Sequence, residues 1–131
     1  MSERIVGGLI SERNLVGVLV GLLQSGDLAT ATQLYEESGR AVAEQLFAQL
    51  ARSEQAVREA GVNMYVQARD FARAARLHES ARFWPDAARL YEEAGDMTSA
   101  ARCWKKAGEM SRAAQALDAS GAVEEAAALY H

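Results

Sequence analysis

Few residues in this chain could carry chemistry, and their spacing does not bring them together. Cys103 is the single cysteine, so it cannot build a zinc site, and no His or helix N-terminus that would activate a catalytic thiol is indicated beside it. His78 and His131 lack metal-ligand spacing. The adjacent glutamates Glu92-Glu93 would point about 100° apart on a helix, unlike a catalytic carboxylate pair. We therefore expect a protein that is not an enzyme and that has no metal and no cofactor.

The composition of the chain argues against several other classes of protein. The 131 residues are 50% hydrophobic and 24% charged, which is typical of one globular domain. The formal net charge of −4 argues against a nucleic-acid-binding surface, which needs a basic excess. The apolar run from Leu15 to Leu23 is far shorter than the roughly 20 residues that cross a bilayer, and its Gly17-x-x-x-Gly21 motif is interpreted as ordinary helix packing. Without a signal peptide pattern or paired cysteines, a cytoplasmic location is expected, and the excess of arginine over lysine favours a bacterial source.

A repeat of 13 residues organises the second half of the chain. Its clearest mark is a series of alanine pairs, which begin at Ala74, Ala87, Ala100, Ala113 and Ala126. Apolar columns at relative positions 1, 4, 5 and 8 form the stripe of an amphipathic helix. Another column holds the residues expected to end each helix, since glycine adopts the left-handed cap conformation without strain: Arg82, Gly95, Gly108 and Gly121.

Each unit therefore predicts one short helix and a tight turn. Asp27 and Asp96 follow glycines and are placed to accept bonds from the first amides of the next helix, and Pro85 fits a first turn. Toward the N-terminus the repeat weakens, with about four residues inserted near positions 41–57. We expect an all-α chain of about nine helices of roughly ten residues, the first around Ser11 to Gln24. Six aromatic residues in the apolar columns are expected in the core: Tyr35, Tyr65, Trp84, Tyr91, Trp104 and Tyr130.

Taken in pairs, the units resemble tetratricopeptide repeats. The best copy contains Trp84, Ala87-Ala88, Tyr91, Gly95-Asp96, Ala100, Trp104 and Ala107. The hairpins recur every 26 residues instead of the family's 34, which is more similar to the compact SNAP-like and clathrin-like solenoids. The resemblance implies a right-handed α-solenoid over residues 28–131, capped by a helical region at residues 1–27, whose work is to bind other proteins.

The resemblance also places a column of polar residues on the concave face, where they would contact a helical or extended partner segment: Gln33, Asn63, Arg89 and Gln115. A second candidate surface is a group of arginines that would attract an acidic partner: Arg69, Arg73, Arg76 and Arg102. The alternative is a helical oligomerisation or regulatory module cut from a larger enzyme or signalling protein. Since the chain stops in the middle of a unit at Tyr130-His131, we expect either a longer parent protein or a homodimer formed through the open end.

Overall fold

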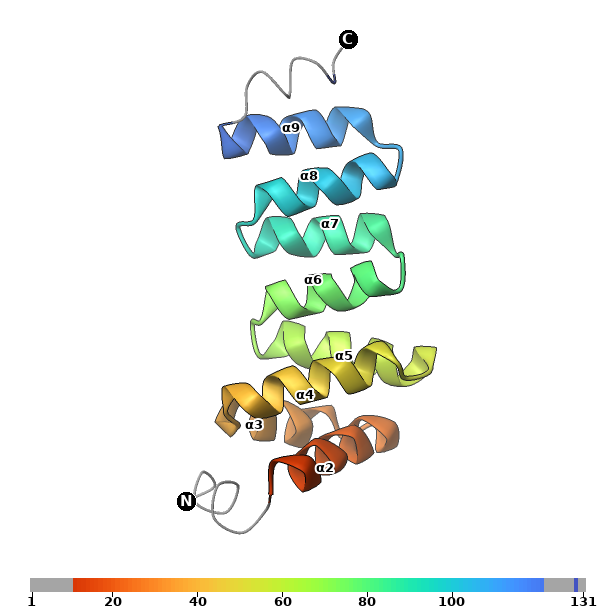
Figure 1. Ribbon diagram of the computed structural model, residues 1–131, viewed down its shortest axis with the longest axis vertical. Coiled ribbons are helices and arrows are strands. Elements are labelled where there is room, and N and C mark those ends of the chain that lie inside the picture. Colours follow the sequence, from red (N-terminus) through yellow and green to blue (C-terminus); the bar gives the residue numbers. More distant parts are fainter. Residues whose placement is uncertain (1–10, 122–128, 130–131) are drawn as a thin grey trace. The chain divides into compact units, whose positions relative to one another are not determined.

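The computed structural model describes residues 11–121 and Leu129, and this part of the chain is helical without strands (Figure 1). Two compact units divide the chain, residues 1–70 and 71–131. Eight helices are described: α2 (Glu12–Ser25), α3 (Leu28–Glu37), α4 (Arg40–Ala51), α5 (Gln55–Gln67), α6 (Phe71–Ser80), α7 (Trp84–Glu93), α8 (Met97–Lys106) and α9 (Met110–Ser120). The all-α, helical-repeat-like expectation is confirmed. The expected ninth helix falls on residues 122–131, of which only Leu129 is described.

In the second unit, the 13-residue repeat becomes a regular series of helices. The helices α6, α7, α8 and α9 begin at residues 71, 84, 97 and 110, and each packs against the next. The alanine pairs of these four helices are buried in the unit and are at most 1% exposed. Because alanine has only a methyl side chain, the helices can approach closely and bury their backbones against one another. Short helices that would be marginal alone are stabilised in this way.

The turns of the second unit confirm the expected helix ends. Gly95 has a φ of 82°, and the amide of Asp96 donates to the carbonyl of Tyr91 over 2.9 Å, which closes a Schellman turn. The Asp96 carboxylate then accepts from the Ser99 amide at 3.1 Å and caps α8, as predicted. Arg82 holds the equivalent left-handed position with a φ of 64° although it is not a glycine, so this turn carries backbone strain.

The first unit is built differently, because α2 packs against α3, α4 and α5, and α5 also contacts α3 and α4. Ser11 caps α2, which confirms the helix expected from Ser11 to Gln24. The inserted residues lengthen helices: α4 has 12 residues and α5 has 13, against 10 in α6, α7 and α8. Leu19 of α2 and Leu46 of α4 are fully buried in this unit. The proposed boundary between residues 1–27 and 28–131 stays a prediction.

The aromatic columns lie largely in the core, as expected. Trp84 is only partly buried, and Tyr130 lies outside the described residues. Tyr35 and Tyr65 meet edge to face with ring centroids 5.2 Å apart in the first unit. The other aromatic residues of these columns are buried in the second unit: Tyr91 and Trp104.

Candidate functional site

The predicted row of partner-binding residues is exposed along its whole length. Gln33 on α3 and Asn63 on α5 belong to the first unit, where these two helices pack together. Arg89 on α7 and Gln115 on α9 belong to the second unit. Gln33 also lines a shallow depression of about 190 Å³ on α3. The row therefore supplies polar contacts to solvent in each unit, and its role in binding stays a prediction.

Arg89 lies on a polar face of the second unit. Its guanidinium is 3.5 Å from Asp86 and 5.5 Å from the ring centroid of Trp104. Arg112 of α9 approaches the same ring at 5.0 Å, so two cations from different helices flank Trp104. The indole Nε1 of Trp104 donates to the carboxylate of Glu92 at 3.0 Å. These contacts orient Arg89 while its side chain stays 57% exposed.

The four arginines of the second predicted surface have different surroundings. Arg69 belongs to the first unit and has a φ of 61°, in the turn between α5 and α6. Arg73 is half-buried and Arg76 is exposed, both on α6. Arg102 of α8 makes an ion pair of 2.8 Å with Glu79. That pair offsets the charge of Arg102, so it is less available to an acidic partner than the sequence suggests.

Glu79 also links α6 to α7. Its carboxylate accepts a 2.6 Å hydrogen bond from the phenol of Tyr91 and contacts Arg102 through three N–H···O bonds of 2.8 to 3.2 Å. Burial, then the hydrogen bond to Glu79, raises the pKa of Tyr91 above its ordinary value of 10. The bond to Glu79 also raises the pKa of Arg102. Glu79 and Tyr91 are 12 residues apart, as are Glu92 and Trp104, so the repeat places an acceptor for each aromatic donor on the preceding helix.

Cys103 of α8 is fully buried in the core of the second unit. Burial is the largest of the causes that raise the pKa of Cys103 from 9 to about 11. The thiol is therefore protonated near neutral pH, and a nucleophile needs the thiolate. No group of three or more His, Cys, Asp or Glu side chains in the described part of the chain is arranged to hold a metal ion.

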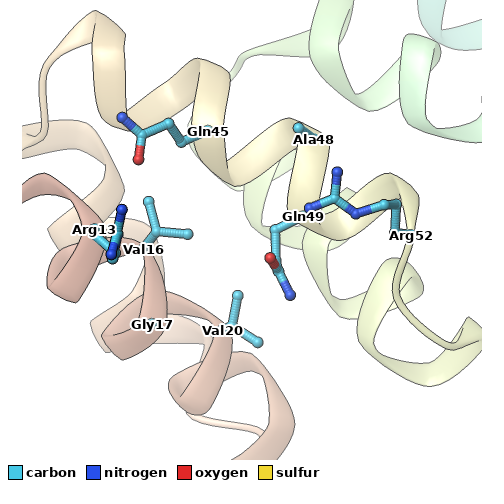
Figure 2. Close-up of a pocket in the computed structure, with 8 residues that line it drawn as sticks. All are labelled: Arg13, Val16, Gly17, Val20, Gln45, Ala48, Gln49 and Arg52. Carbon is cyan, nitrogen blue, oxygen red and sulfur yellow. The ribbon is translucent and has the colours of Figure 1, made fainter.

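A cavity in the first unit was not predicted from the sequence. A groove of about 440 Å³ runs between α2 and α4 (Figure 2). Its lining comes from two stretches of chain: Arg13, Val16, Gly17 and Val20 from α2, and Gln45, Ala48 and Gln49 from α4 with Arg52 directly after that helix. In each stretch these residues are spaced i, i+3, i+4 and i+7, so each side of the groove presents one continuous stripe. That spacing was the available sequence signal, but polar and small residues dominate the stripe on α4.

Gly17 has a different role from the one expected. The Gly17-x-x-x-Gly21 motif was interpreted as a site of close helix packing. Both glycines are exposed, and within the described residues a Cβ added to either would have no neighbouring atom within 4 Å. The packing interpretation therefore fails for the part of the chain that the structure describes. At Gly17, the missing side chain instead leaves open space in the lining of the groove.

Comparisons with known proteins add no family: the chain matches no protein-family model, and no curated protein or solved structure matches it. Of the helices in residues 11–121, none has the length and apolar character needed to cross a membrane. The fold and the groove thus define an all-α, helical-repeat-like protein. Membership of the tetratricopeptide family stays an expectation from the sequence.

Proposed function

We propose that this chain is a non-catalytic scaffold for protein–protein interaction, which binds a helical or extended segment of a partner protein. The groove between α2 and α4 is the observation that carries this proposal. It combines apolar side chains, Val16 and Val20, with the amides of Gln45 and Gln49. An apolar floor with a few convergent polar groups is the usual composition of a site that binds a peptide or another ligand.

The exposed polar row gives the proposal a second set of contacts. Its amide and guanidinium groups could bind the main chain or the carboxylates of a partner segment, as could the arginines Arg69, Arg73 and Arg76. A right-handed, tetratricopeptide-like solenoid over residues 28–131 and a cytoplasmic location belong to the same proposal. The buried, protonated thiol of Cys103 supports a role that does not depend on nucleophilic chemistry.

Photo-crosslinking tests this function without a known partner. The full chain would carry a photoreactive phenylalanine analogue at Ala48 in the groove, at Asn63 or Gln115 in the row, and at Ala119 as a control. Ala119 is an exposed residue of α9 that belongs neither to the row nor to the groove. We expect the same partner protein to be crosslinked in a native lysate from Ala48 or the row, but not from Ala119.

Competition by unlabelled chain tests whether that crosslink is specific. Excess unlabelled chain should remove the crosslink, and an Asn63→Ala, Arg89→Ala double variant should compete less well if the row contributes. Equal crosslinking from all positions, or none from any, would contradict the scaffold function. A crosslink from the row alone would preserve the function and move the docking site away from the groove.

A further inference from the structure

The groove between α2 and α4 has dimensions that suit the binding of a third helix. Each wall is a stripe whose end residues are seven positions apart, or about 10 Å at the helical rise of 1.5 Å per residue. Figure 2 shows Arg13 facing Gln45 at one end, and Val20 facing Gln49 near Arg52 at the other. The channel between two such helices accepts the side-chain ridge of another helix.

The groove is positively charged, whereas the protein as a whole has a net negative charge. Arg13 and Arg52 stand at its opposite ends, and none of its eight lining residues is acidic. The chain as a whole has 18 acidic and 14 basic residues, a net charge of −4. A positive groove on an acidic protein favours a segment that carries carboxylates at both ends of the contact.

The middle of the groove is apolar and has room. Val16 is buried and Val20 is half-buried, and Ala48 adds a small apolar side chain to the lining from α4. Gly17 lies between the two valines in sequence and adds no side chain. An apolar side chain from a partner could therefore enter beside Gly17 and lose its contact with water.

We propose that this groove binds an acidic amphipathic helix of a partner protein. Two carboxylates seven residues apart on that helix pair with Arg13 and Arg52, and an apolar pair midway between them packs on Val16, Gly17 and Val20. Gln45 and Gln49 donate hydrogen bonds to the polar flank of the helix. This inference rests on the proposed scaffold function and specifies the chemistry of the partner.

A designed peptide provides the probe. It is a fluorescein-labelled, alanine-based helical peptide with two glutamates seven residues apart and a leucine pair midway between them. In its control, both glutamates are replaced by glutamine. Fluorescence anisotropy with the full chain should show saturable binding of the acidic peptide, about 2- to 30-fold tighter than the glutamine control at low salt. Added salt should weaken the acidic peptide's binding because it screens the exposed charge pairs.

Matched variants locate the binding. Gly17→Leu fills the groove, and Gly21→Leu adds the same side chain one turn along α2, outside the lining. Both replace glycine by a better helix former, so loss of folding would not explain a difference between them. Arg13→Glu with Arg52→Glu should weaken binding about tenfold or more. Reversal of two exposed cations outside the groove, Arg40→Glu with Lys105→Glu, changes the net charge equally and should have a smaller effect.

The outcomes distinguish this inference from the broader function. Equal binding of both peptides, no saturable binding, or binding by Gly17→Leu equal to that of Gly21→Leu would overturn the acidic-helix proposal. A solution mass of two chains that Gly17→Leu reduces to one would make a second copy the occupant, and would overturn it too. In each case, a partner crosslinked from Asn63 or Gln115 would leave the scaffold function standing.

Discussion

Replacing Glu79 should lower the stability of the second unit, because its carboxylate binds side chains from two other helices. Glu79→Ala removes the acceptor of the Tyr91 phenol, which is only 5% exposed and bonded at 2.6 Å. A charge-assisted bond to a buried hydroxyl contributes about 2 kcal/mol, and its loss leaves the phenol without this acceptor. The Arg102 pair, with side chains 48% and 25% exposed, adds at most about 1 kcal/mol. We expect the free energy of unfolding to fall by about 3 kcal/mol.

Urea unfolding followed by far-UV circular dichroism measures this loss. Glu93→Ala removes an exposed glutamate from the neighbouring helix and should change stability by less than about 0.5 kcal/mol. Combined with Tyr91→Phe in a double-mutant cycle, Glu79→Ala should show a coupling of about 1 kcal/mol or more. A cost below about 0.5 kcal/mol for Glu79→Ala, or strict additivity with Tyr91→Phe, would refute the argument that this network links α6 to α7.

Three further predictions follow from backbone strain, packing and titration. Arg82→Gly should raise the unfolding free energy by about 0.5 kcal/mol in urea titrations, because glycine adopts the φ of 64° more easily; a loss of stability would contradict the strain. Gly61→Ala should lower the melting temperature, since its Cβ would stand 2.7 Å from Cδ1 of buried Leu50, whereas Gly21→Ala, in open space, should raise it; the reverse order would refute the packing. The pKa of Cys103 is raised to about 11, so the unfolded chain loses this proton first and stability should fall as pH rises from about 9 to 11. Unfolding at a series of pH values should show a shallower slope for Cys103→Ala, and rapid labelling of the native thiol at neutral pH would contradict its burial.

The sequence was most informative where the repeat is regular. Alanine pairs every 13 residues predicted a regular series of short helices, because each helix must present the same small surface to its neighbours. The structure confirms the series, with helices that begin at residues 71, 84, 97 and 110. Gly95, Gly108 and Gly121 predicted the helix ends, with φ values of 82°, 81° and 89°. Arg82 shares that conformation, and only its place in the glycine column indicated it.

The first unit was harder to predict. Its helices α4 and α5 are longer than the repeat unit, and α2 packs against three helices rather than one neighbour. The groove depends on which stripe of α2 lies beside which stripe of α4, and that register comes from tertiary packing. Gln45, Ala48 and Gln49 have no periodic hydrophobicity to signal a shared surface. The sequence singles out Gly17, but its motif suggests helix packing rather than the open space found beside it.

The central claim is that a partner segment docks between α2 and α4. A nuclear magnetic resonance titration of the isotope-labelled full chain with the acidic helical peptide tests it most directly. We expect the largest shifts at the backbone amides of Gly17 and Ala48 and at the side-chain amides of Gln45 and Gln49, with little change in residues 71–121. Shifts confined to the second unit, or spread evenly over the surface, would contradict it.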